Sequence, residues 1–127
     1  MVLLRHSAKS EQSEKWEAQL RKGCLELAIL ASLWDKRLYG LEILRVLEEN
    51  SNLILAEGTV YPILGRLKEE GLLHSEWVEA EAGHPRKYYW LTASGRLKVV
   101  SMAQFWNSFA ANLNLLLKPV LNGKGRG

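Results

Sequence analysis

Apolar residues recur along the first part of the chain at helical spacing, and they do so on two sides at once. The segment Ser13–Trp34 therefore predicts a helix that starts with Ser13 as its cap. A helix that is apolar on two sides is buried from two directions, so we expect it to contact its own domain and a second surface. Residues 1–12 are then an N-terminal extension. The two stripes are Leu20, Cys24, Leu27, Ala31 and Trp34 on one side, and Leu25, Ile29 and Leu33 on the other.

Two more helices follow in the predicted order, with a short strand between them. The segment Tyr39–Asn50 predicts a helix after the polar link Asp35–Leu38. Leu53 and Leu55 then alternate like a short strand. The segment Glu57–Leu73 contains a third predicted helix, which groups four apolar side chains on its inner face: Val60, Ile63, Leu64 and Leu67.

The next residues alternate in the manner of a β-hairpin. The runs Leu73–Val78 and Arg86–Leu91 favour strands, and the polar tip Glu79–Pro85 separates them. In the second strand we expect Tyr89 and Leu91 to face inward. The hairpin therefore has one face toward the core.

A long helix is expected after the hairpin. Thr92 is a suitable cap for a helix from Ala93 to about Leu117, and we expect Pro119 to end it. The sequence after this proline becomes polar and rich in glycine. Residues 120–127 are therefore predicted to be a disordered tail.

The outer face of the third predicted helix carries residues that helices normally avoid. Glycine in a helix interior costs about 1 kcal/mol and proline about 3 kcal/mol, yet Gly58, Pro62 and Gly65 lie together on this face. Pro62 is tolerable because it lies close to the start of the helix. Residues without bulky side chains let a flat or grooved partner approach the backbone closely. This pattern favours a helix that enters a groove of DNA.

Polar side chains flank that smooth face. We expect Thr59, Tyr61 and Arg66 to contact phosphates or base edges, and Lys68 lies nearer the edge of the same face. The exposed N–H groups at the start of the helix add affinity for anions. The alternative is an ordinary solvated helix face.

A basic hairpin beside such a helix is typical of a winged helix-turn-helix. Arg86 and Lys87 are expected to contact phosphates, and His84 at the same tip is a further candidate, with an ordinary solvated loop as the alternative. Tyr39 either donates its hydroxyl to a phosphate or packs against the hairpin. The predicted fold class is mainly α with a small β-hairpin: a winged helix-turn-helix over residues 13–92 and a C-terminal dimerisation helix over residues 93–119.

Overall composition sets loose limits on function. The 127 residues fit one domain, and the formal charge of +3 permits a polyanionic partner without demanding one. Cys24 is the only cysteine, so no intrachain disulfide can form. The first residues are too few for the apolar part of a signal peptide, and no apolar run reaches about 18 residues. A cytoplasmic protein with no membrane partner is the expectation.

Catalysis and metal binding find no support in the sequence. His6, His74 and His84 are scattered, with no carboxylate or cysteine at ligand spacing. Cys24 lies on an apolar stripe and is expected to be buried rather than reactive. We therefore expect neither an enzyme nor a bound cofactor.

Three motifs, in this order, resemble the PadR family of bacterial transcriptional regulators: LELAILASLWDKRLYGLEILRVLE, EGTVYPILGRLKEEGLL and SEWVEAEAGHPRKYYWLTASGR. The match covers roughly Leu20 to Arg96, and the single helix after the hairpin is similar to the short-tailed members. The resemblance implies a winged-helix repressor that dimerises through its C-terminal helix. It also implies a palindromic operator on double-stranded DNA and release by a small effector.

The last predicted helix carries a long apolar stripe that a finished domain leaves uncovered. A second copy of the chain is the expected cover, with the first helix as the counterpart. The alternative is that the stripe belongs to the core of the same chain. The residues expected at the dimer interface are Leu20, Leu27, Trp106, Phe109, Leu113, Leu116 and Leu117.

Trp106 is also a candidate effector-binding residue. The resemblance to multidrug-sensing members implies that a tryptophan near this point lines a cavity at the dimer interface and stacks on flat aromatic ligands. The alternative is that Trp106 simply packs the interface. For the whole chain, the second hypothesis is a winged-helix module that binds protein through its third helix and has little affinity for DNA.

Overall fold

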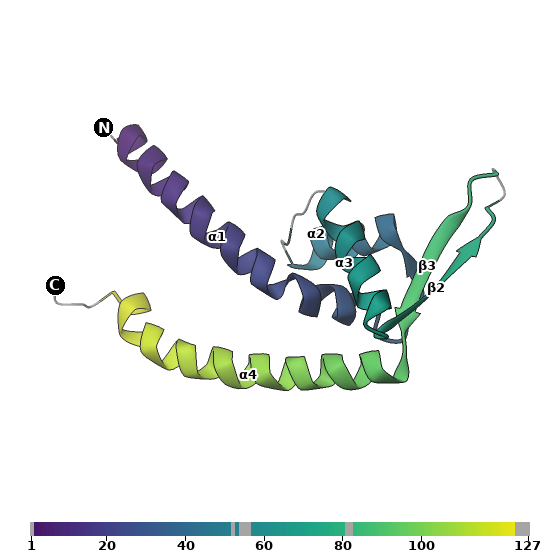
Figure 1. Ribbon diagram of the computed structural model, residues 1–127. Coiled ribbons are helices and arrows are strands. Elements are labelled where there is room, and N and C mark those ends of the chain that lie inside the picture. Colours follow the sequence, from purple (N-terminus) through teal and green to yellow (C-terminus); the bar gives the residue numbers. More distant parts are fainter. Residues whose placement is uncertain (1, 52, 54–56, 81–82, 124–127) are drawn as a thin grey trace.

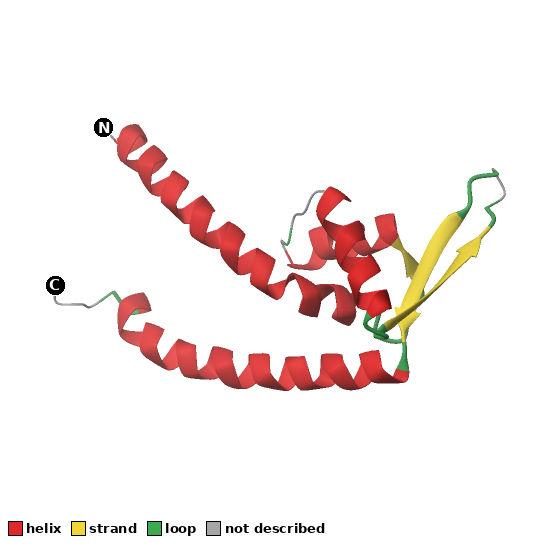
Figure 2. Ribbon diagram, in the orientation of Figure 1, coloured by secondary structure: helices red, strands yellow, loops and turns green. Residues whose placement is uncertain are grey.

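Two long helices extend from a small unit of shorter helices and strands in the computed structural model, which describes residues 2–51, 53, 57–80 and 83–123. The hairpin β2–β3 projects to one side of α2 and α3, and α1 and α4 extend to the other (Figure 1). The fold is mainly helical, and the described strands form one small sheet (Figure 2). The elements are α1 (Val2–Ser32), β1 (Leu38–Tyr39), α2 (Gly40–Ser51), α3 (Glu57–Glu69), β2 (Leu73–Val78), β3 (Arg86–Leu91) and α4 (Ala93–Leu121).

The sheet is antiparallel, with the strand order β1-β3-β2. β2 and β3 pair along their whole length and have the predicted bounds. β1 adds two pairs at the other edge of β3, Leu38 with Tyr89 and Tyr39 with Tyr88. The sequence pattern predicts only a polar link over Asp35–Leu38. A strand of two residues is too short to show an alternating pattern, so the sequence did not predict β1.

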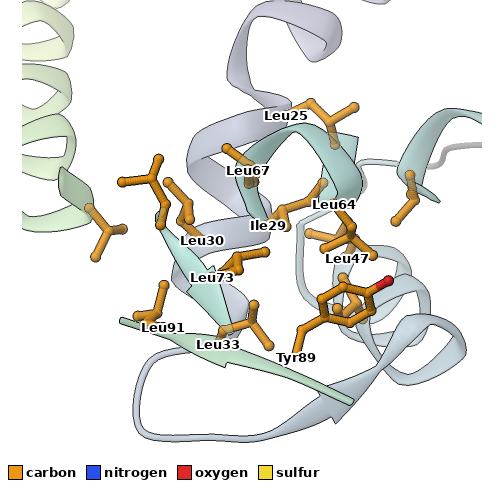
Figure 3. Packing of buried hydrophobic residues seen from close by; sticks show 14 of the residues in the cluster. Leu25, Ile29, Leu30, Leu33, Leu47, Leu64, Leu67, Leu73, Tyr89 and Leu91 are labelled. Carbon is orange, nitrogen blue, oxygen red and sulfur yellow. The ribbon is translucent and has the colours of Figure 1, made fainter. Parts of the chain in front are cut away.

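The core lies where α1, α2 and α3 meet the inner face of the sheet (Figure 3). Tyr89 and Leu91 close it from β3, as the alternation predicted. Burial of one such aliphatic side chain stabilises the fold by about 1.5–3 kcal/mol. The largest fully buried side chains of the core are Leu25, Ile29, Leu30, Leu33, Ile43, Val60, Leu64 and Leu67. We call α2, α3, the sheet and the last part of α1 that packs on them the winged unit.

α1 is longer than the sequence pattern predicted. It starts at Val2, so the predicted start at Ser13 is wrong and Ser13 lies inside the helix. Residues 2–12 include neither glycine nor proline, the two residues that disfavour a helix most. The stripe centred on Ile29 is buried, whereas Leu20 on the other stripe is exposed. The second side of α1 is therefore left open by the described part of the chain.

The predicted short strand between α2 and α3 is not observed. Leu53 has no regular secondary structure, and Leu55 lies outside the described residues. Leu53 packs against the core instead, and its N–H donates to the carbonyl oxygen of Leu47 at 3.3 Å. Carbonyl oxygens in the last turns of a helix commonly accept hydrogen bonds from groups outside it. Leu53 therefore helps to end α2.

α4 continues beyond its predicted end. Pro119 lies inside the helix, which ends at Leu121 with Asn122 as its C-cap. Proline removes one backbone hydrogen bond, but in the last turn few such bonds remain to be lost. The predicted disordered tail is therefore wrong for residues 120 and 121, and residues 124–127 lie outside the described part. Among the helices within the described ranges, we find none with an apolar stretch long enough to cross a membrane.

The start of α4 agrees with the prediction. Thr92 caps the helix, and its hydroxyl oxygen accepts the N–H of Gly95 at 2.9 Å. The same hydroxyl donates to the carbonyl oxygen of Gly71 at 2.7 Å. The long C-terminal helix is thus attached directly to the turn that follows α3.

Candidate nucleic-acid interface

α3 packs one side into the core and turns the other side to solvent. Val60, Leu64 and Leu67 are fully buried and Ile63 is half-buried, as the helical spacing predicted. Gly71 closes the turn after the helix with a φ of 80°, a left-handed conformation that favours glycine. The helix is therefore held firmly from the inside while its outer face stays accessible.

The outer face of α3 is smooth. Gly58 and Gly65 are exposed, and outside their own helix no described atom lies within 4 Å of where a Cβ would stand. Pro62 lies between them inside the helix and is also exposed. A flat or grooved partner can therefore approach the backbone of α3 closely at these residues.

The side chain of Tyr61 projects from α3 toward the start of α2. Its ring and hydroxyl lie over Gly40, so close that a Cβ on Gly40 would come within 3.0 Å of them. Burial raises the pKa of Tyr89, and the nearby Tyr61 raises it further. Tyr61 still exposes 44% of its surface. This side chain is thus both positioned by α2 and accessible to a partner.

Tyr39 packs against the hairpin, one of the two roles considered for it, and a contact of its hydroxyl with a phosphate stays a prediction. Its ring meets that of Tyr88 edge-on, with 5.4 Å between ring centroids, and the Arg86 guanidinium carbon lies 4.5 Å from the Tyr39 centroid. The N–H of Tyr39 donates to Glu42 at 3.1 Å, which caps the start of α2. Tyr39 and Arg86 therefore meet on one face of the sheet, next to the start of α2.

The adjacent basic residues of the hairpin point to opposite faces of the sheet. Side chains alternate along a strand, so Lys87 shares a face with Tyr89, and Arg86 lies on the other face with Tyr88. The Lys87 Nζ lies 5.6 Å from the ring centroid of Trp77 and 5.9 Å from that of Tyr89. The sequence suggested one tandem cluster. The structure instead places one cation on each side of the hairpin, each beside aromatic rings.

Arg66 is already engaged by carboxylates. Its guanidinium donates to Glu26 of α1 at 3.1 Å and to Glu70, directly after α3, at 3.0 Å. Hydrogen bonding to Glu26, and then to Glu70, raises the pKa of Arg66 above its ordinary value. On the helical wheel Arg66 and Tyr61 lie on opposite flanks of α3. A phosphate would have to compete for Arg66, which is not the free donor that the sequence suggested.

Three other predicted contact residues are exposed. Thr59 and Lys68 lie on α3, and His84 follows Gly83 at the tip of the hairpin. Their exposure fits contact with a large partner. A role in DNA contact stays a prediction for each of them.

A groove runs between α1 and α4. Two adjoining cavities, of about 570 Å³ and about 340 Å³, form it and share four lining residues. Cys24, which was expected to be buried, is half-buried here because it faces this open space. The shared lining residues are Leu20, Cys24, Leu27 and Trp106.

The apolar stripe of α4 is exposed along most of its length. Trp106 and Phe109 lie 6.1 Å apart between ring centroids, and Leu27 faces the same groove from α1 while also packing against the core. The described part of the chain leaves the stripe uncovered, and its role as a dimer interface stays a prediction. The exposed members are Trp106, Phe109, Leu113, Leu116 and Leu117.

Two features of these surfaces were missed by the sequence analysis. Phe105 exposes 69% of its surface and stacks on Phe109, four residues later, so helical spacing could have added it to the stripe. The pair of Arg66 with Glu70 also has the helical i,i+4 spacing. The contact of Arg66 with Glu26 joins two distant segments, and no local signal could have revealed it.

The outer face of α3 and the hairpin together present side chains suited to binding. The guanidinium of Arg86 and the accessible side chain of Tyr61 are donors that match phosphate oxygens. Within the described ranges, no three His, Cys, Asp or Glu side chains gather closely enough to hold a metal ion. The surface therefore presents a smooth helix flanked by hydrogen-bond donors.

Comparisons with known proteins agree with this geometry. Residues 29–100 match the model of the transcriptional regulator PadR-like family. The structure of a PadR-like transcription factor from Bacteroides fragilis is similar, with 39% sequence identity and a TM-score of 0.67 over 80% of this chain and 98% of that one. A PadR family transcriptional regulator from Eggerthella lenta has 28% identity and a TM-score of 0.79, over 87% of this chain and 96% of that one.

A third similar structure is that of Bacillus subtilis PadR in complex with operator DNA. It has 26% identity and a TM-score of 0.59, over 62% of this chain and 45% of that one. The family match spans more than half of this chain, from α1 into the first turns of α4, and so includes α3 and the whole sheet. This chain belongs to the PadR-like family of transcriptional regulators.

Proposed function

We propose that this chain is a sequence-specific DNA-binding regulator, a homodimer that represses transcription from a palindromic operator and is released by a small effector. The observation that carries DNA binding is the outer face of α3, which is smooth at Gly58 and Gly65 and lies beside a basic hairpin. The complex of the similar Bacillus subtilis PadR with operator DNA supports double-stranded DNA as the partner. A regulator of transcription acts where the DNA is, so we expect the protein in the cytoplasm.

In this proposal α3 enters the major groove, and the hairpin touches the backbone or the neighbouring minor groove. Tyr61, held over Gly40, contacts a phosphate or a base edge. The hairpin cations lie on opposite faces, so each neutralises a different phosphate. The proposed contact residues are Tyr39, Thr59, Tyr61, Arg66, Lys68, His84, Arg86 and Lys87.

Exposed apolar surface supports the homodimer. The stripe on α4 and the groove between α1 and α4 belong to the same chain, so one copy can offer the stripe while its partner offers the groove. A monomeric soluble protein rarely exposes an apolar patch as long as this one. A second copy related by twofold symmetry would present two α3 helices to the two halves of a palindrome.

The first test measures binding to duplex DNA at increasing salt. A protein that neutralises several phosphates shows log K falling linearly with log salt, with a slope of about −0.9 for each phosphate contact. Arg86→Ala is expected to weaken binding to every duplex and to flatten this slope by about one unit. Tyr61→Ala is expected to reduce discrimination between sequences instead. Lys118→Ala, near the far end of α4, removes a cation away from the interface and serves as the control.

Three outcomes decide between the candidate functions. Selection of bound sequences from a random pool should return a palindrome if the proposal is right. Identical binding by the parent, Arg86→Ala and Tyr61→Ala would contradict the assigned surface. A chain that ignores duplexes even at low salt would favour the protein-interaction module.

Trp106 is the proposed contact for a small aromatic effector. It lines both cavities of the groove, where its ring can stack on a flat ligand. Titration with flat aromatic compounds should quench tryptophan fluorescence in the parent and much less in Trp106→Phe. Trp77→Phe, on the hairpin, should respond like the parent. An unchanged response of Trp106→Phe would assign Trp106 to packing alone.

A further inference from the structure

Residues 92–96 form the junction at which α4 leaves the winged unit, and we call them the α4 root. If two copies pair through α4, the direction of α4 at its root decides how far apart the two α3 helices lie and how they are rotated. Contacts at the root therefore bear on DNA recognition, although the root is not part of the candidate interface.

The first set of contacts ties the root to the end of α3. The N–H of Thr92 donates to the carbonyl oxygen of Leu72 at 3.1 Å, and its hydroxyl donates to that of Gly71 at 2.7 Å. The N–H groups of the same two residues, Gly71 and Leu72, bond back to carbonyl oxygens of α3 at 3.0 Å. Gly71 and Leu72 thus end α3, and their carbonyl oxygens also hold Thr92, the cap of α4. The start of α4 is therefore held in a fixed position relative to the end of α3.

Gly95 is buried at this junction and has no room for a side chain. A Cβ at this position would collide with the carbonyl oxygen of Leu72 and stand 3.2 Å from a side-chain carbon of Leu91. The Leu72 oxygen is backbone and already accepts the N–H of Thr92, so it cannot move aside alone. A methyl group on residue 95 must therefore shift α4 relative to the end of α3.

Arg96 holds the other side of the root to the end of α1. Its guanidinium carbon lies 4.1 Å from the ring centroid of Trp34, and its Nη1 donates to the Asp35 carboxylate at 3.0 Å. Asp35 has a φ of 56° in the turn directly after α1. An exposed pair of this kind adds little stability. The contacts of Arg96 with Trp34 and Asp35 matter for geometry, because they fix the direction of α4 relative to the end of α1.

We propose that the α4 root sets the spacing of the two DNA half-sites that the dimer accepts, with Gly95 as a positioning residue. Twenty residues of helix make a lever of about 30 Å, and a tilt of about 10° moves its far end by about 5 Å. That displacement exceeds the rise of one base pair, about 3.4 Å. A small change at the root therefore selects a different spacing without altering α3. The inference rests on the homodimeric DNA binding proposed above.

The test uses the full chain and duplexes that carry either one half-site or two inverted half-sites taken from the random-pool selection. The distance between half-site centres varies in single base-pair steps around one helical turn, about 10 base pairs. The parent is compared with Gly95→Ala, with Arg96→Gln and with a control, Ser94→Ala, at the exposed neighbouring position. Fluorescence anisotropy gives affinities, and sedimentation gives the oligomeric state.

Gly95→Ala is expected to bind one half-site within about twofold of the parent, because α3 is unchanged. At the parent's best spacing it should bind at least about tenfold more weakly, and its own optimum should move by one base pair or more. Arg96→Gln should keep the optimum but reduce its advantage over neighbouring spacings by about threefold, because α4 is then held less tightly. Ser94→Ala should reproduce the parent.

Spacing profiles of Gly95→Ala and Arg96→Gln that match the parent would overturn the inference. If Gly95→Ala does not fold, as judged by thermal unfolding, Arg96→Gln decides alone, and an unchanged profile has the same meaning. A parent that binds two half-sites no better than one would contradict the homodimer itself, and the inference would fall with it.

Discussion

The winged unit and the two long arms, α4 and the first part of α1, differ in how much apolar surface they expose to solvent. Ile29 and Leu64 in the winged unit are fully buried, whereas Leu116 on α4 exposes 74% of its surface. Hydrophobic stabilisation grows with the apolar area removed from water. The winged unit is therefore stabilised by its own chain, while the arms gain full stability only when something covers them. The contrast supports the proposed division between a winged unit that recognises DNA and arms that pair with a second copy.

The largest effect is expected from a cavity in the winged unit. Leu64→Ala removes a fully buried side chain and should lower the free energy of unfolding by about 2–5 kcal/mol in urea titrations. Leu116→Ala removes the same atoms from the exposed stripe. Its cost should be small in dilute protein and grow with protein concentration, because it acts through the second copy. Equal losses of unfolding free energy for both variants at every protein concentration would show that the winged unit and α4 do not differ in this way.

A charge on the stripe of α4 should have the next largest effect. Phe109→Glu would bury an unpaired carboxylate in the proposed interface, so the dimer Kd should rise at least about tenfold in sedimentation equilibrium. Gln104→Glu places the same charge on the far side of α4 and should leave association unchanged. Binding to a single half-site should survive in Phe109→Glu, because the winged unit is intact. Dissociation caused equally by Gln104→Glu would show that the stripe is not the interface.

The smallest effect concerns a contact that joins α1 to α3. Glu26 accepts from Arg66 at 3.1 Å, so it competes with any phosphate for that guanidinium. Glu26→Gln should tighten DNA binding by about two- to fivefold in anisotropy titrations and change stability by less than about 1 kcal/mol. Glu17→Gln, elsewhere on α1, removes one negative charge and controls for net charge. A loss of affinity in Glu26→Gln would mean that the ion pair of Arg66 with Glu26 positions α3 for DNA binding and does not compete with phosphate.

Sequence patterns predicted α3, the hairpin and the start of α4 correctly. The spacing of Leu64 and its neighbours placed α3, and the alternation through Tyr89 placed the hairpin with the right bounds. Thr92 was identified as a helix cap because a cap needs only local sequence. These features depend on residues close together along the chain, so one sequence contains enough information to find them.

Features that depend on distant segments could not be predicted in this way. The position of Tyr61 over Gly40 follows from how α3 packs against α2. Arg66 and Glu26, which form a hydrogen bond, are 40 residues apart in the sequence. Helix ends were also uncertain: α1 begins at Val2 because nothing before residue 13 interrupts it. Periodicity describes the middle of an element well and its ends poorly.

The only thiol of the chain, at Cys24, faces the groove between α1 and α4. A maleimide reagent reaches it through the mouth of that groove, and a partner molecule seated there would slow the alkylation. If two copies pair through this groove as proposed, the rate of alkylation of Cys24 reports their association without any engineered label.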